Sequence, residues 1–273
     1  MNRNETDHRK DICAVIVSYD PGSILLDNIE ALLPQVHRCI LVDNGSHNDE
    51  IVKEAEERYG VEVIELGENK GIAFALNVGL EYCVKNEFPM FLSMDQDTVL
   101  EPDAVDHLAK ALIEEGAVSA GINWDRSISK DKSVEYLITS GNLVLVEAAK
   151  SIDGFDASLF IDSVDFDFCL RLRDKGYKIV KVADAGARHN LGDETGSGRF
   201  RTHSAFRWYY ISRNHFYIIK KHGSRHRLFC LKKRAAFLKE MIMLAMWDKE
   251  RGAKFKALLQ GYRDYKRFRG NMK

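Results

Sequence analysis

Two aspartates, Asp95 and Asp97, stand one residue apart directly after the apolar run at 91–94. Two like charges this close repel each other unless a cation lies between them. Carboxylate oxygens are hard ligands that suit Mg²⁺ or Mn²⁺, and these ions commonly also bind substrate phosphates. The pair therefore predicts a divalent cation that carries a diphosphate, and the alternative is a pair of ordinary turn residues.

Polar residues also follow two earlier apolar runs. Ser18 and Tyr19 end the run at 12–18, and Asp43 ends the run at 39–43. In open α/β sheets, ligands bind outside the carboxyl ends of the strands, so we expect these residues to share one edge with Asp95. The residues at 43–46 are also typical of an ordinary turn, so a functional role for them depends on that shared edge.

The elements that must position these residues alternate along the first half of the chain. In the stretch at 71–86, apolar residues recur every four positions, which indicates one face of a helix. Alternation of strands and helices is typical of a parallel sheet covered on both faces. The expected strands are 12–18, 39–43, 61–66, 90–94, 117–122, 142–146 and 177–182, and the expected helices are 22–34, 47–59, 71–86 and 163–175.

Length and composition indicate a globular protein. The 273 residues are 45% hydrophobic, which is enough for a large core. The N-terminus at 1–10 is a charged tail without the apolar run of a secretory signal, and no later segment has eighteen uncharged apolar residues. The five cysteines contain no Cys-x-x-Cys pair and predict buried free thiols. We therefore expect a cytoplasmic protein that neither enters the secretory route nor spans a membrane.

Charge divides the chain sharply near residue 199. Residues 1–198 hold 19 Lys and Arg against 37 Asp and Glu, a net charge of −18, whereas residues 199–273 hold 21 against 4, a net charge of +17. A basic segment of this kind seeks an anionic surface. Residues 203–273 have a helical pattern that mixes basic residues with the aromatic residues Trp208, Tyr209, Tyr210, Phe216 and Tyr217.

Three functions suit this basic region. Aromatic rings at headgroup depth beside Lys and Arg favour an anionic membrane surface, at the inner face of the cytoplasmic membrane. Phosphate contacts and base stacking would instead suit nucleic acid, which we do not expect here. The third alternative is a set of solvated helices around a core of their own, an arrangement that is also compatible with a homodimer.

Six motifs occur in order along the chain: VIVSY at 15–19, LVDNGS at 41–46, NKGIAFALN at 69–77, DQD at 95–97, GFD at 154–156 and FIDSVDFDFCLR at 160–171. On these motifs the chain resembles the family 2 glycosyltransferases of GT-A fold, from about residue 12 to residue 198. The DQD and IDxVD forms are similar to those of bacterial rhamnosyltransferases, which use dTDP-L-rhamnose to build surface polysaccharide. The resemblance implies a mixed, mainly parallel α/β catalytic domain at 11–202, followed by a helical extension at 203–273.

The resemblance also implies a role for each matching residue. Ser18 and Tyr19 would border the nucleotide base, and Asp43 would accept a hydrogen bond from the base imide. Lys70 would help hold the nucleotide. Asp95 would face the ribose, while Asp97 and His189 would contact the metal. Without the resemblance, Lys70 would count as a solvated lysine and His189 as an ordinary surface or core histidine.

Asp165 falls where the family places its catalytic base. It would lie in the first turn of the 163–175 helix, where unpaired amide groups favour the ionised carboxylate. An inverting transfer needs one carboxylate to deprotonate the acceptor hydroxyl. The family often has Glu before this Asp, whereas Val164 stands here, so Asp162 and Asp167 are alternative bases. Asp162 also suits a helix N-cap, and Asp167 an intrahelical pair with Arg171.

The acceptor side is expected near Ser140, Gly141, Asn142 and Asp162. The glycine-rich stretch at 191–198 suggests either a loop that closes over the donor or a plain linker. The sequence thus predicts a metal-dependent, inverting glycosyltransferase. A nucleotidyltransferase is disfavoured because 18–23 lacks a glycine-rich phosphate loop, and a non-catalytic nucleic-acid-binding protein would leave the aspartates without a purpose.

Overall fold

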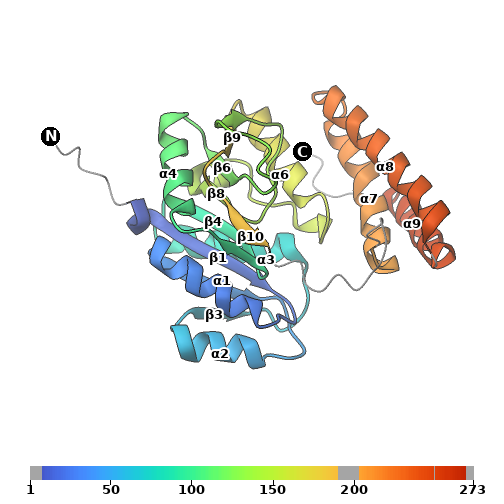
Figure 1. Cartoon of the computed structure of the whole chain (residues 1–273). Coiled ribbons are helices and arrows are strands. Elements are labelled where there is room, and N and C mark those ends of the chain that lie inside the picture. Colours follow the sequence, from blue (N-terminus) through green and yellow to red (C-terminus); the bar gives the residue numbers. More distant parts are fainter. Residues whose placement is uncertain (1–7, 190–202, 249, 269–273) are drawn as a thin grey trace.

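An eight-stranded sheet lies at the centre of the computed structural model, which describes residues 8–189, 203–248 and 250–268 (Figure 1). The strand order is β3-β2-β1-β4-β8-β6-β9-β7. The glycine-rich stretch at 191–198 lies outside the described residues, so its expected role as a loop or linker stays a prediction.

The first half of the sheet is parallel. Its strands are β1 (Ile12–Ser18), β2 (Arg38–Asp43), β3 (Glu62–Glu65) and β4 (Met90–Asp95), and the helices between them are α1 (Ile24–Leu32), α2 (Glu50–Tyr59) and α3 (Ile72–Lys85). All seven residues of β1 are buried, as expected for a central strand covered on both faces. The predicted strand–helix alternation is confirmed, although α1 and α2 begin two and three residues later than expected, after short irregular stretches at 22–23 and 47–49.

The second half of the sheet is mixed. It holds β6 (Ser119–Ile122), β7 (Lys132–Ser133), β8 (Asn142–Leu145) and β9 (Ile179–Val182), with helices α4 (Ala104–Glu114), α5 (Val146–Ser151) and α6 (Val164–Asp174). Strand β8 runs antiparallel to both β4 and β6. Helix α4 was not predicted, and Val146 starts α5 instead of ending the preceding strand.

Three short 3₁₀ helices and a small second sheet complete this part of the chain. The 3₁₀ helices are η1 (His8–Asp11), η2 (Leu33–Gln35) and η3 (Ala157–Leu159), and the second sheet pairs β5 (Thr98–Leu100) with β10 (Ala187–His189).

The two faces of the main sheet carry separate cores. On one face, Ile12, Ala14 and Ile16 pack in a cluster with α1 and α4. On the other face, Val15 packs in a cluster with α3, α5 and α6. The period of two along β1 therefore divides the molecule into three layers (Figure 1).

The C-terminal region folds into α7 (Ala205–His222), α8 (Arg227–Trp247) and α9 (Arg251–Tyr265). Trp208, Leu244 and Leu258 form the small core of this bundle, and Tyr217 of α7 joins the core beside α6. Trp208 and Tyr217 are 1% and 0% exposed, so the expectation that these two rings lie at membrane headgroup depth is wrong. No described helix is both long and apolar enough to cross a membrane. The five cysteines are free and buried, as predicted.

Candidate active site

The carboxyl ends of three strands meet at one edge of the sheet. Ser18 of β1 is paired in register with Asp43 of β2, and Val17 is paired with Asp95 of β4. The Ser18 hydroxyl donates a hydrogen bond to Asp43 Oδ1 at 3.1 Å. The predicted shared edge is therefore confirmed.

A cleft of about 740 Å³ opens at this edge. Of the residues that the sequence singled out, Ser18, Tyr19, Asp95 and Asp97 line it from the strand ends, and Asp162 and Asp165 line it from the stretch that leads into α6. Residues far apart in the sequence thus surround one space.

The turn between β4 and β5 carries the pair of aspartates. Strand β4 ends at Asp95, one residue later than expected, and Asp97 lies in the following turn. The side chain of Gln96 turns to the neighbouring strand end, where its Oε1 accepts the Tyr19 N–H at 2.7 Å. Both aspartates still line the cleft, but the turn and not strand geometry places them there.

Ser140 and Asn142 lie beneath this turn. Ser140 Oγ accepts the Asp95 N–H at 2.9 Å and donates to Thr98 Oγ1 at 2.8 Å, and Asn142 Oδ1 accepts from Ser119 Oγ at 2.7 Å. Both side chains are buried, and neither residue lines the cleft. Gly141, which has a φ of +72°, donates its N–H to the Ser93 carbonyl at 2.9 Å. The structure thus places Ser140 in support of the aspartate turn and places Gly141 and Asn142 against β4 and β6. None of the three lines the cleft.

The backbone of His189 lies close to Asp97. In the pairing of β10 with β5, His189 is the register partner of Thr98, which follows Asp97 in the chain. The backbones of Asp97 and His189, about ninety positions apart in the sequence, are therefore close in space. The role of His189 as a metal ligand stays a prediction.

Two tight loops border the cleft beside β2. Gly45 and Gly71 have φ values of +81° and +86°, and a Cβ at either position would lie within 2.7 Å of backbone atoms of Glu68 or Phe160. Asn44 joins the loops, since its Oδ1 accepts the Lys70 N–H at 2.9 Å. Gly71 and Asn44 line the cleft.

Asp43 and Lys70 lie behind that lining. Both Asp43 carboxylate oxygens accept hydrogen bonds from Ser46, and Lys70 Nζ lies 3.7 Å from Glu68 Oε1 and 5.2 Å from the centre of the Phe74 ring. The Asp43 carboxylate is thus held in place by its own loop, and the Lys70 ammonium group lies among the side chains of its own loop and of α3.

The segment before α6 is held in an unusual backbone conformation. Phe160, Asp162 and Ser163 all have positive φ values, 65°, 64° and 67°, which L-residues seldom adopt. Asn214 of α7 stabilises the segment, because its Nδ2 lies 2.9, 2.7 and 2.9 Å from the carbonyl oxygens of residues 159, 161 and 162. Arg207 Nη2 donates to Asp162 Oδ1 at 3.0 Å. The N-cap of α6 is Ser163, so the suggestion that Asp162 is the N-cap is wrong. The contacts of Asn214 and Arg207 show that α7 helps to position this side of the cleft.

Asp165 is a partly buried carboxylate in the first turn of α6. Its pKa is raised to about 6, mainly by burial and also by the nearby charge of Asp162, whereas the Phe166 N–H and the Lys233 ammonium group oppose the shift. The Phe166 N–H donates to Asp165 Oδ1 at 2.9 Å. The expected effect of the helix N-terminus is therefore outweighed by desolvation. At pH 7 the carboxylate is still mainly ionised.

Asp167, two residues further on, is fully buried in an ionic network. Its carboxylate lies 2.7 Å from Arg171 Nε and 2.8 Å from both Lys221 Nζ and His222 Nε2. Burial alone would raise its pKa, but the hydrogen bond from His222 and the charges of Arg171 and Lys221 hold the pKa well below the usual range. The predicted pair with Arg171 is confirmed, and Asp167 does not line the cleft, so its suggested role as an alternative base is not supported.

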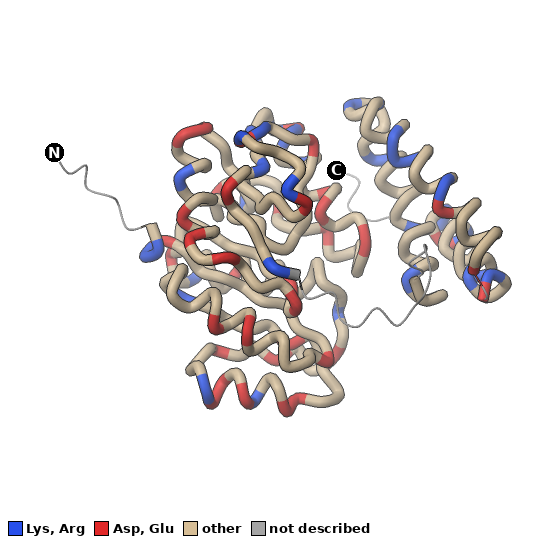
Figure 2. The backbone as a smooth tube through the Cα atoms, in the orientation of Figure 1, with Lys and Arg blue, Asp and Glu red and all other residues tan. Residues whose placement is uncertain are grey.

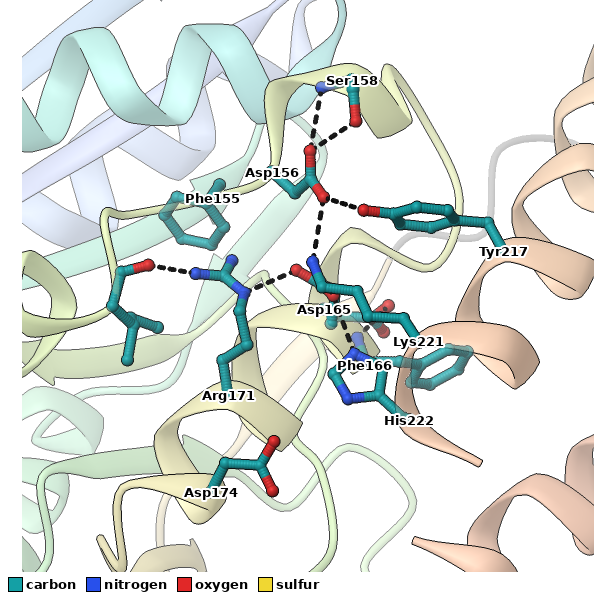
Figure 3. Close-up of polar contacts among 12 residues, drawn as sticks. Phe155, Asp156, Ser158, Asp165, Phe166, Arg171, Asp174, Tyr217, Lys221 and His222 are labelled. Atoms are coloured by element: carbon teal, nitrogen blue, oxygen red, sulfur yellow. Dashed lines mark hydrogen bonds and ion pairs between the residues drawn. The ribbon is translucent and has the colours of Figure 1, made fainter. Parts of the chain in front are cut away.

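The same network includes Asp156 of the GFD motif. Tyr217 donates to Asp156 Oδ2 at 2.8 Å, and Lys221 Nζ lies 3.0 Å from the same oxygen. Figure 3 shows Tyr217, Lys221 and His222 reaching this cluster from α7. Part of the positive charge of the C-terminal region therefore neutralises buried acidic groups of the N-terminal part.

One other cluster in the described part of the chain has the composition of a metal site. Ligand atoms of Asp174, His222 and His226 lie within 4.8 Å of one another, at the end of α6 distant in sequence from Asp97. Asp174 pairs with His226 at 3.0 Å and with Arg225 at 3.1 Å. The packing of α6 against the α7–α8 turn therefore accounts for this cluster.

Comparison with known proteins identifies the family. Residues 13–175 match the family model described as Glycosyl transferase family 2. The chain belongs to this family. It is 30% identical over 241 residues to "dTDP-rhamnosyl transferase RfbF" of Shigella flexneri, and the match covers 77% of this chain and 80% of that protein.

A solved structure matches the fold of this glycosyltransferase. The crystal structure of GalNAc-T7 with UDP, GalNAc and Mn²⁺ superimposes with a TM-score of 0.66 at 11% identity. The superposition covers 97% of this chain and 57% of that chain, so this chain spans little more than half of its length. The predicted GT-A fold is therefore confirmed, and the family finding favours the glycosyltransferase over the nucleotidyltransferase and the nucleic-acid-binding alternatives.

Sequence reasoning missed three residues that shape the cleft of this glycosyltransferase. Gln96 was only the spacer of the DQD motif, Arg207 was counted with the basic tail, and Asn214 was not singled out. The uncharged polar side chain of Asn214 among the aromatic, basic and apolar residues of α7 was a signal in the sequence that could have indicated a buried contact.

Proposed function

We propose that this glycosyltransferase moves L-rhamnose from dTDP-L-rhamnose to a saccharide or lipid-linked saccharide acceptor, with inversion at the anomeric carbon. The observation that carries the proposal is the cleft, which is lined both by the strand ends with Asp95 and Asp97 and by Asp165. The DQD and IDxVD motifs and the name of the Shigella relative support the choice of donor.

The donor would bind along the strand ends. Ser18, Tyr19 and Asp95 would contact the nucleoside, since all three line the cleft, while Asp43 and Lys70 would act from the loops behind it. An exposed carboxylate at Asp97 with the backbone of His189 beside it fits a hard divalent cation. When bound there, Mg²⁺ or Mn²⁺ would stabilise the diphosphate leaving group.

Asp165 would serve as the base. As the acceptor hydroxyl oxygen attacks the anomeric carbon, its proton passes to the Asp165 carboxylate, the bond to the diphosphate breaks, and no sugar–enzyme bond forms. A carboxylate with a pKa of about 6 binds this proton more strongly than an ordinary aspartate with a pKa of 3.8, and yet is mainly ionised at neutral pH.

The acceptor would enter from the side of α7. Phe206 and Arg207 of α7 line the cleft together with Asp162, so this wall is available to a saccharide. The suggested acceptor role of Ser140, Gly141 and Asn142 would then be indirect, through the strands and the aspartate turn that they contact. A lipid-linked acceptor would be presented at a bilayer, and the basic residues of 203–273 suit the anionic inner face of the cytoplasmic membrane.

A donor screen tests this function. The full chain is incubated with dTDP-rhamnose, UDP-sugars and GDP-sugars in the presence of Mn²⁺ and a saccharide acceptor, and the products are detected by mass spectrometry. We expect rhamnosyl product from dTDP-rhamnose, and a loss of about 100-fold or more in Asp97→Ala and after chelation of the metal. Asp106→Ala, which removes an exposed aspartate of α4, is the matched control. Product from another donor alone, or full activity of Asp97→Ala, would reject the donor or the site.

A further inference from the structure

Helix α8 presents a row of apolar side chains to solvent. Leu228, Leu231, Leu238 and Ile242 are 61%, 63%, 57% and 50% exposed. They recur at steps of three, four and seven residues and therefore lie on one side of the helix. Phe229, Cys230 and Leu244, on the other side, are buried. We call the four exposed residues the α8 stripe.

Cations border the α8 stripe. Arg227, Arg234, Lys232 and Lys239 are exposed, and helical geometry places the two arginines along one edge of the stripe and the two lysines along the other. The one acidic residue of α8, Glu240, lies on the opposite side of the helix from the stripe, where it lines a small cavity with Lys233 and Phe237. Figure 2 shows basic residues along these C-terminal helices and many acidic residues over the sheet. The outward face of α8 is thus apolar at its centre and cationic at its borders.

We propose that the α8 stripe docks on an anionic lipid bilayer, with α8 lying in the plane of the interface. The inference rests on the proposed function in that a lipid-linked acceptor would be presented at the same surface. An apolar face bordered by Lys and Arg is the pattern that inserts into the headgroup region of anionic membranes. Because no described helix can cross a bilayer, α8 would lie on it.

A second copy of the chain fits this face less well. Two-fold pairing of two α8 helices would set the same surface against itself. The borders of that surface carry Arg and Lys, and the outward face of α8 offers no carboxylate to pair with them. Like charges would then meet along both edges of the contact, which disfavours the dimer. Anionic lipid supplies the opposite charge at both edges.

Vesicle flotation of the full chain tests the inference. Vesicles contain phosphatidylcholine alone or phosphatidylcholine mixed with phosphatidylglycerol. We expect about tenfold more protein to float with the mixed vesicles than with the neutral ones. Leu231→Ser/Ile242→Ser should reduce that flotation about tenfold, and Arg234→Gln/Lys239→Gln should remove the preference for anionic lipid. Ile113→Ser, on α4 and 64% exposed, is the matched control and should float like the original chain.

Two results would overturn the inference. One is equal flotation of the Leu231→Ser/Ile242→Ser variant and the original chain. The other is a dimer in sedimentation that this variant converts to a monomer while neither protein binds vesicles, which would assign the stripe to a second copy. Transfer to a water-soluble acceptor without vesicles reports on the proposed function separately. Retained transfer without flotation rejects the membrane contact alone, and flotation without transfer rejects the enzyme assignment alone.

Discussion

Asp165 and Asp167 lie two residues apart in the same turn of α6, and yet their environments are opposite. Asp167 is fully buried and Asp165 is partly buried, and burial raises the pKa of a carboxyl group in either place. Asp167 is surrounded by Arg171, Lys221 and His222, and its pKa falls below the usual range. Asp165 has no cation within ion-pair distance in the described part of the chain, and its pKa rises to about 6.

The difference in pKa gives the two aspartates different roles, one structural and one chemical. Asp167 joins the C-terminal helices to the sheet and is held as a permanent anion, which cannot exchange a proton near neutral pH. Asp165 faces the cleft and is available to accept a proton. The partners on α7, and not the position in the helix, decide which of the two carboxylates is a candidate base.

The largest expected effect is the loss of transfer in Asp165→Asn. The amide keeps the shape of the side chain but cannot accept the proton, so we expect kcat to fall by about 10³-fold. Initial rates with dTDP-rhamnose measure this effect, and Asp106→Asn on α4 is the control. If Asp165→Asn keeps the normal transfer rate while Asp162→Asn is inactive, the base is Asp162, and the role assigned to Asp165 is wrong.

The change Asp167→Asn should act on stability. It removes the carboxylate partner of the partly buried Arg171 and leaves the buried Lys221 with Asp156 alone, so we expect the free energy of unfolding to fall by about 3–5 kcal/mol. Urea denaturation at neutral pH measures the loss. Asp49→Asn, which breaks a surface pair with Lys53 at 2.8 Å, should cost less than about 1 kcal/mol. A cost for Asp167→Asn as small as that of the control would contradict the role of the network.

The same substitution at Asp165 should have the opposite effect on stability. A carboxyl group whose pKa is raised from 3.8 to about 6 in the folded protein favours the fold at low pH, and this contribution is lost as pH rises through about 6. Asp165→Asn, which does not ionise, should therefore be more stable than the original chain by up to about 3 kcal/mol near pH 8. The gain should vanish near pH 4. Denaturant titrations at both values test the sign, and a destabilised variant near pH 8 would refute it.

The smallest expected effect is a shift of the pH profile in Lys233→Met. The ammonium group of Lys233 lowers the pKa of Asp165, so its removal should raise that pKa. The acid limb of kcat/KM, expected near pH 6 in the original chain, should move upward by less than about one pH unit. Lys239→Met on the exposed side of α8 is the control. A limb that stays in place, or moves downward, would exclude electrostatic coupling between Lys233 and Asp165.

Local signals predicted the strands and the edge where the polar residues gather. An apolar run that stops at a polar residue is a property of neighbouring positions, and it placed Ser18, Asp43 and Asp95 correctly. The difference between Asp165 and Asp167 depends on Lys221 and His222, more than fifty residues later, which no local pattern relates to α6. The buried aromatic residues of α7 were misjudged for the same reason.

The central claim is that Asp165 binds a proton more strongly than an ordinary aspartate and that Asp167 binds one less strongly. Carbon-13 NMR of labelled aspartate side chains measures this directly, with resonances assigned by their loss in Asp165→Asn and Asp167→Asn. We predict that Asp165 titrates near pH 6 and that Asp167 titrates below the usual value of 3.8. If Asp165 titrates at or below 3.8, it is no better a base than its buried neighbour, and the account is contradicted.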